Sequence, residues 1–193
     1  GADGVLLNRH RKLMPTNPER MVHAPGDAAG LRTVDTPIGR LGTLLCWENY
    51  MPLARYALYA QGVEIYIAPT YDSGDSWIGS LRHIALEGRC WVLGSGTVLR
   101  GSDIPEDFPG REQLFADPQE WINDGDSLVV DPMGRLVAGP LHREEGILYA
   151  DIDVAQVAPA RHTFDVSGHY ARADIFELQV RRTPATSLRQ VDD

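Results

Sequence analysis

One cysteine lies where a strand is predicted to pass into a helix. Thr43, Leu44 and Leu45 form a short apolar run with a β-branched member, which is typical of a strand. From Met51 onward the apolar spacing becomes helical, so Cys46 falls at the junction of the two elements. Backbone N–H groups and a helix N-terminus favour the thiolate form of a thiol placed among them. This position therefore indicates a reactive thiol.

A structural alternative stays open for both cysteines. Free cysteine is among the most frequently buried residue types and behaves as a small hydrophobe in most proteins. Cys90 opens the apolar segment 90–93 and is predicted to be a core residue. Cys46 on its own would be interpreted in the same way, and only its neighbours argue for chemistry.

A basic run and an acidic residue precede the junction. His10, Arg11 and Lys12 lie on a predicted loop, and such a run is usually a solvated face. Pro18 and Glu19 then suit the first turn of a short helix, where a carboxylate can cap free N–H groups. Taken alone, this segment predicts a surface loop followed by a capped turn.

His83 is the residue to weigh for a cysteine–histidine hydrolase. It lies one turn before Glu87 on a predicted helix, which favours a helix-surface pair or a satisfied interior histidine. Nothing in its spacing predicts a contact with Cys46.

Several blocks of residues, taken in order, resemble the nitrilases, the branch of the carbon–nitrogen hydrolase superfamily that acts on nitriles. The two main blocks read Cys46-Trp47-Glu48-Asn49-Tyr50-Met51-Pro52 and His10-Arg11-Lys12-Leu13-Met14-Pro15-Thr16. They are similar to the family's nucleophile segment and lysine motif, and the spacing from Lys12 to Cys46 and the place of Glu19 also agree. Further blocks match at 72–75, 81–90 and 165–172, so the resemblance covers nearly the whole chain.

The resemblance implies roles for four residues. Cys46 is the nucleophile, and Lys12 stabilises the negative charge that develops on the substrate. Glu19 holds Lys12 and orients the substrate, and the backbone N–H of Trp47 assists as an oxyanion donor. The family's general base is a glutamate well upstream of the lysine motif, and no glutamate precedes Lys12 in this sequence. We therefore expect the carboxyl-terminal part of a longer enzyme, with a short protein that has lost its chemistry as the alternative.

Composition and charge bound the remaining function classes. The chain of 193 residues is 43% hydrophobic and carries a formal net charge of −9, which argues against nucleic acid or an anionic membrane as the main partner. Cys46 and Cys90 show no Cys-x-x-Cys spacing, so neither a disulfide framework nor a zinc motif is predicted. No apolar run approaches the roughly 20 residues that cross a bilayer. We expect a cytoplasmic protein that needs no metal or organic cofactor.

The order of the predicted elements indicates an α/β fold. Strands are expected at 41–46, 63–68 and 90–93, the second ending at Pro69, with intervening helices at 51–61 and 76–89. This alternation predicts parallel strands joined by crossovers. The other predicted elements are strands at 4–7, 31–36, 127–131, 136–139 and 146–152, a helical turn at 17–22, a long loop at 101–126, and helices at 154–161 and 172–182.

The resemblance implies a particular arrangement of these elements. The family fold is a four-layer α-β-β-α sandwich, which we expect here to be incomplete at the N-terminus. It would form one carbon–nitrogen hydrolase domain over residues 1–182, followed by a carboxyl-terminal tail at 183–193.

Together, the residues and the resemblance predict a thiol hydrolase. A small-molecule nitrile would be converted to the carboxylic acid and ammonia through a cysteine thioimidate and a thioester. An amidase or carbamoyl-amide hydrolase of the same superfamily is the nearest alternative, although the Trp47-Glu48-Asn49 run favours the nitrilase branch. A non-catalytic assembly subunit is the alternative from another class. The resemblance also implies a homo-oligomer, either a dimer or a helical assembly.

Overall fold

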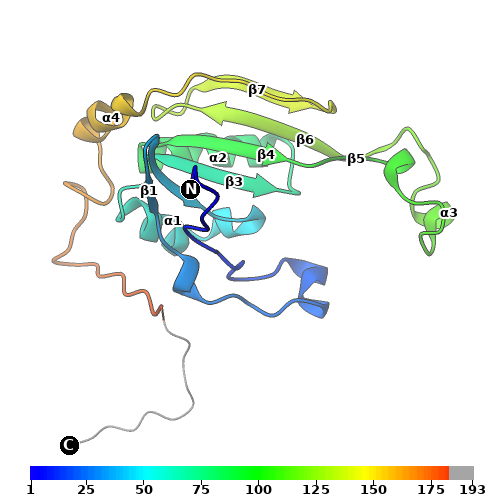
Figure 1. Cartoon of the computed structure of the whole chain (residues 1–193), viewed down its shortest axis with the longest axis horizontal. Helices are drawn as coiled ribbons and strands as arrows, with labels where there is room; N and C mark the ends of the chain where they lie inside the picture. Colours follow the sequence, from blue (N-terminus) through cyan, green and yellow to red (C-terminus); the bar gives the residue numbers. More distant parts are fainter. Residues whose placement is uncertain (183–193) are drawn as a thin grey trace, which may run out of the picture.

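Three parallel strands form the centre of the sheet (Figure 1). β3 (Ile65–Thr70) lies between β2 (Gly39–Thr43) and β4 (Trp91–Gly96), and both pairings are parallel. α1 (Pro52–Tyr59) connects β2 with β3, and α2 (Asp75–Gly88) connects β3 with β4. The computed structural model, which describes residues 1–182, thus confirms the predicted alternation of strands and helices.

Antiparallel strands extend the sheet on both sides. β1 (Val34–Thr36) forms a hairpin with β2. β1 falls within the strand predicted at 31–36, and β2 overlaps the one predicted at 41–46. On the other side β6 (Trp121–Val130) pairs with β4 and also with β5 (Val98–Arg100) and β7 (Leu136–His142). The described residues make one seven-stranded mixed sheet with helices packed on it. This arrangement confirms the α/β class and agrees with an α-β sandwich.

The remaining helices are short. η1 matches the helical turn predicted after Lys12, and η5 with α4 matches the helix predicted at 154–161, where Pro159 falls in the first turn of α4 and needs no N–H donor. The short helices, with η marking 3₁₀ geometry, are η1 (Asn17–Met21), η2 (Ala28–Gly30), η3 (Cys46–Tyr50), η4 (Gly101–Asp103), α3 (Arg111–Leu114), η5 (Val154–Gln156) and α4 (Val157–Thr163).

The two faces of the sheet bury alternate residues of each strand. Tyr66, Val92 and Leu128 belong to the core that α1 and α2 cover. Ile65 and Trp91, one position away along the same strands, pack in a second core on the opposite face. Because full burial of an apolar side chain stabilises a protein by roughly 1.5–3 kcal/mol, these clusters hold rigid the strands on which the site is built.

β3 does not end at Pro69 as predicted. It continues to Thr70 and pairs Pro69 with Ser95 of β4. β2 pairs with β3 only as far as Ile67, so no neighbour on that side requires a donor from the proline. The prediction was wrong because a residue without an N–H is tolerated where a neighbouring strand has already ended.

Three further predicted elements are absent from the described residues. Segments 4–7 and 146–152 form no strand, and 172–182 forms no helix. Leu148 and Ile152 pack against one face of the sheet, so their alternation reflects burial on one side without backbone pairing. In the last segment Leu178 packs against the core, but Ile175 and Phe176 are exposed, so no continuous apolar face is buried to stabilise a short helix there.

The loop predicted at 101–126 is shorter than expected. β6 begins at Trp121, and η4 and α3 occupy part of the remainder. The strands predicted at 127–131 and 136–139 are confirmed by β6 and β7, which pair antiparallel. The tail predicted at 183–193 lies outside the described residues.

Candidate active site

Cys46 lies between β2 and α1, at the strand-to-helix junction where the sequence predicts it. β2 ends at Thr43, three residues before the cysteine, and Cys46 is the first residue of η3. Its φ of 52° is in the left-handed region, where a non-glycine residue costs about 1 to 3 kcal/mol. The residue is partly exposed. A strained backbone conformation at this position requires stabilising contacts from neighbouring residues.

Asn49 holds the turn from the inside. Its side-chain amide donates to the carbonyls of Leu44 at 3.1 Å and Cys46 at 2.7 Å. The hydroxyl of Tyr66, on β3, donates to the Asn49 side-chain oxygen at 2.7 Å. Burial raises the pKa of Tyr66 well above its ordinary value, so this hydroxyl stays a donor at neutral pH. The strained turn is therefore anchored to the middle strand of the sheet.

Lys12 and Glu19 form an ion pair within one segment. Lys12 Nζ lies 2.5 Å from Glu19 Oε2 and 2.9 Å from Thr16 Oγ1. Glu19 also accepts from the backbone N–H of Thr16 at 2.5 Å, so it caps η1 as well. The hydrogen bond from Lys12, followed by that from Thr16, lowers the pKa of Glu19 below its ordinary value of 4.5. The carboxylate is therefore ionised at neutral pH, when it faces the ammonium.

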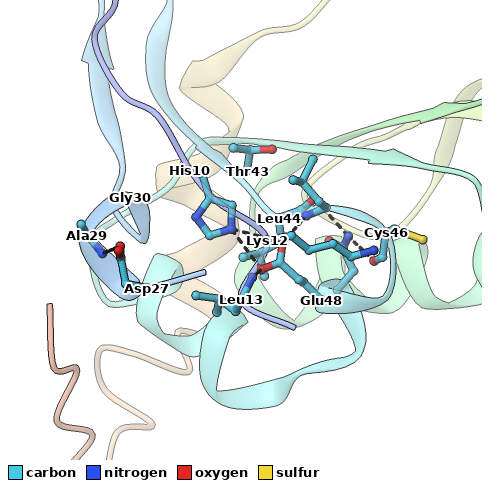
Figure 2. Close-up of polar contacts among 12 residues, drawn as sticks. His10, Lys12, Leu13, Asp27, Ala29, Gly30, Thr43, Leu44, Cys46 and Glu48 are labelled. Atoms are coloured by element: carbon cyan, nitrogen blue, oxygen red, sulfur yellow. Dashed lines mark hydrogen bonds and ion pairs between the residues drawn. The ribbon is translucent and has the colours of Figure 1, made fainter. Parts of the chain in front are cut away.

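Glu48 is a buried carboxylate to which the sequence pattern assigned no role. Its side chain is 0% exposed, two residues after Cys46. Oε1 accepts from the backbone N–H of Leu13 at 2.5 Å, and Oε2 accepts from that of Leu45 at 2.7 Å. Nε2 of His10 lies 3.0 Å from Oε1 and 3.1 Å from Oε2. Figure 2 shows His10 and Leu13 joined to Glu48 by dashed lines, with Cys46 drawn beside them. One carboxylate thus links the basic segment to the nucleophile segment.

The sequence contains a signal for this link, although spacing alone cannot identify the partners. A carboxylate within a largely apolar junction needs donors if it is buried. The donors His10 and Leu13 lie 38 and 35 positions from Glu48. The surface prediction for the basic run is wrong for His10, whose side chain is 3% exposed, because the ring turns inward to meet this carboxylate.

Trp47 lies on the outer side of the junction and is 52% exposed. Its indole N–H donates to Asp72 at 3.0 Å, and the Tyr50 hydroxyl donates to the same carboxylate oxygen at 2.8 Å. Burial, followed by the Asp72 hydrogen bond, raises the pKa of Tyr50 to about 12. The backbone N–H of Trp47 lies in the first turn of η3, where amides lack a partner within the helix. This placement suits an oxyanion donor, and that role stays a prediction.

A pocket of about 320 Å³ opens beside Trp47. Met14 and Met51 supply further apolar lining, and Arg20 contributes a cationic group. The pocket is therefore built jointly by the lysine segment and the residues that follow Cys46.

Lys12 and Cys46 are not joined directly. Among residues 1–182 no hydrogen bond or ion pair connects the two side chains, since Lys12 donates to Thr16 and Glu19. Their segments meet instead through the buried carboxylate of Glu48. The structure thus brings Lys12 and Glu19 into contact. Cys46 is connected to them only indirectly, because Glu48 accepts from the backbone N–H groups beside Lys12 and beside Cys46.

The other two candidates lie away from this centre. His83 Nε2 is 3.6 Å from Glu87 on α2, which confirms the predicted helix-surface pair. Cys90 is fully buried, and burial raises the pKa of its thiol to about 12. Cys90 is therefore confirmed as a core residue.

The described part of the chain contains no group of three or more His, Cys, Asp or Glu residues that could hold a metal ion. None of the helices within residues 1–182 is long and apolar enough to cross a membrane.

The sequence matches the carbon–nitrogen hydrolase family over residues 1–162. The chain belongs to this family. It is 47% identical to an aliphatic nitrilase of Sinorhizobium fredii over 95% of this chain and 59% of that protein. It is also 44% identical to a bifunctional nitrilase/nitrile hydratase of Lupinus angustifolius, over 97% of this chain and 55% of that protein.

Solved structures of the superfamily share the fold. A carbon–nitrogen hydrolase from Helicobacter pylori superimposes with a TM-score of 0.74 at 25% identity, over 90% of this chain and 61% of that one. The chain thus spans a little over half the length of the relatives that it matches.

Proposed function

We propose that this protein is a thiol hydrolase that converts a small-molecule nitrile to the carboxylic acid and ammonia. The observation that carries the proposal is the 47% identity to an aliphatic nitrilase over 95% of the chain. The geometry supports it, because a partly exposed cysteine stands on a strained turn and the segment tied to that turn carries a Lys12–Glu19 pair.

In the first half of the proposed reaction, Cys46 acts as the nucleophile. A base removes the thiol proton, and the sulfur attacks the nitrile carbon to form a C–S bond while one C–N π bond breaks. The nitrogen takes up a proton, which gives a thioimidate. By the family resemblance the base is a glutamate. Lys12 and the Trp47 N–H stabilise the charge that develops on the substrate.

In the second half, water replaces nitrogen and then sulfur. One water adds to the thioimidate carbon, and the tetrahedral intermediate expels ammonia to leave a thioester. A second water attacks the thioester, releasing the carboxylic acid and returning a proton to Cys46. Two waters are consumed for each ammonia and acid formed. Glu19 keeps the Lys12 ammonium in place and helps to orient the water.

An amide product is the second candidate. Some relatives at 44% identity are named bifunctional nitrilase/nitrile hydratases. If the tetrahedral intermediate expels the Cys46 sulfur before ammonia leaves, the amide is released and only one water is consumed. The ratio of amide to acid separates the two outcomes.

The test is ammonia release from aliphatic, aromatic and arylacetonitrile substrates by the protein expressed from its complete reading frame. Cys46→Ala is expected to abolish acid formation, and Lys12→Ala to lower it by about 10²- to 10³-fold because a charge stabiliser is lost. Cys90→Ala is the matched control, since it removes a buried thiol and should leave turnover intact. Turnover retained by Cys46→Ala would contradict the proposal. A folded wild type that hydrolyses no nitrile or amide would favour the assembly-subunit alternative.

A further inference from the structure

The Glu48 carboxylate contacts the backbone beside both Lys12 and Cys46. Leu13, directly after the lysine, and Leu45, directly before the cysteine, donate their N–H groups to different oxygens of this one carboxylate. We propose that Glu48 is a positioning residue that sets the separation of Lys12 and Cys46. The inference deepens the proposed nitrile hydrolysis and rests on it.

The burial of Glu48 makes this link strong. Its side chain is 0% exposed, and hydrogen bonds from which water is excluded are stronger than those in water. Since each amide uses its own oxygen, the carboxylate cannot rotate or shift without stretching one of the two bonds. The link therefore transmits the position of one backbone segment to the other.

His10 completes the contact as a third donor. Its Nε2 lies within 3.1 Å of both Glu48 oxygens, and its Nδ1 is buried without a partner. Because both Glu48 oxygens are acceptors, the ring places a proton on Nε2, which faces them. With this proton His10 donates to the carboxylate, and all three contacts on Glu48 are favourable.

Glu48 acts through the backbone and not on the reacting atoms. Within residues 1–182 it makes no hydrogen bond to the side chain of Lys12 or Cys46. Chemistry between two groups is sensitive to their spacing, and a displacement of about 1 Å can cost about 100-fold in rate. Loss of the link should therefore lower kcat more than it weakens substrate binding.

Glu48→Gln is the sharpest variant. It keeps the length of the side chain, but one oxygen becomes an NH₂ donor that cannot accept from an amide. Either Leu13 or Leu45 must then lose its acceptor. Glu48→Asp is the complementary variant, because it keeps the carboxyl group and is too short by one methylene to reach both amides.

Asp131 provides a matched control. It is also a buried carboxylate, and it accepts from the backbone N–H groups of Met133 at 2.8 Å and Arg135 at 3.0 Å and from Arg135 Nε at 2.7 Å. These contacts lie within the turn between β6 and β7. Asp131→Asn thus changes a buried carboxylate with two backbone amides and one side chain, without touching the proposed site.

Amide hydrogen exchange measured by NMR, together with steady-state kinetics, tests the proposal. In Glu48→Gln, exchange at Leu13 or Leu45 is expected to rise by about tenfold or more, and kcat to fall by about 10- to 100-fold with KM changed far less. Glu48→Asp is expected to lower kcat similarly. Asp131→Asn should change neither the exchange of Leu13 and Leu45 nor kcat.

The two proposals fail in different ways. Unchanged exchange at Leu13 and Leu45 in Glu48→Gln, or a wild-type kcat in Glu48→Asp, would overturn the positioning role. Exchange does not require turnover, so it decides whether the link exists even if the wild type hydrolyses no nitrile. That last result would overturn the proposed function.

Discussion

Glu19 and Glu48 both lie near the lysine segment, but the structure holds them differently. Glu19 is 44% exposed and takes its donors, Lys12 and Thr16, from the seven residues before it. Glu48 is 0% exposed, and two of its three donors come from a segment 35 and 38 positions away.

The two carboxylates therefore have different structural roles in the site: Glu19 holds one side chain, and Glu48 holds two segments together. Solvent screens the Lys12–Glu19 pair through its exposed carboxylate, so Glu19 can hold the ammonium in place with little effect on overall stability. The buried carboxylate has water on no side, so its partners depend on it and it fixes where two distant segments meet. A local contact sets the state of one side chain, whereas a buried long-range contact sets the geometry of the site.

The largest expected effect is the loss of stability in Glu48→Ala. It leaves His10 and two backbone N–H groups buried without their acceptor, which is expected to lower the free energy of unfolding by about 3 to 5 kcal/mol. Urea unfolding measures the change. Glu19→Ala is the control and should cost less than about 1 kcal/mol. Equal losses in the two variants would break the comparison between the two carboxylates.

A smaller loss is expected for His10→Ala. The two amides of Leu13 and Leu45 still satisfy the Glu48 carboxylate, so only the third donor and the packing of the ring are lost. We expect a decrease of about 1 to 3 kcal/mol in the free energy of unfolding, measured under the same conditions. A loss as large as that of Glu48→Ala would mean that the histidine, and not the two amides, carries the link.

The smallest effect should appear in the pH dependence of Glu19. Its pKa is lowered in the folded protein, first by the hydrogen bond from Lys12. The stabilisation is therefore fully present above the ordinary pKa of 4.5 and is lost as the pH falls through the lower folded value. Because the carboxylate is partly exposed, the contribution should stay below about 1 kcal/mol.

Thermal unfolding of wild type and Glu19→Gln between pH 7 and pH 3 measures this contribution. The difference in Tm between the two proteins should be constant near neutral pH and should decrease only below about pH 4.5. An equal difference in Tm at pH 7 and at pH 3 would show that the charge of the Lys12–Glu19 pair contributes nothing to stability.

Local sequence patterns determined the order of the central elements and the position of Cys46. The alternation of apolar runs predicts the central β2–α1–β3–α2–β4 order, because strand and helix periods depend on neighbouring residues. The same local information places Cys46 at a strand-to-helix junction. The pair of Lys12 with Glu19, which the family resemblance implies, also lies within one short segment. The roles of Cys46, Lys12, Glu19 and Trp47 in catalysis stay predictions that the variants above can test.

Only the tertiary structure decided the contacts that cross between segments. The link from Glu48 to His10 and Leu13, the continuation of β3 through Pro69, and the absence of a strand at 146–152 all depend on which elements become neighbours. No local period encodes a partner 35 or more positions away, because packing of the whole sheet chooses it. A buried carboxylate is stable only where that packing supplies its donors, and for this reason the tertiary structure was needed to identify Glu48.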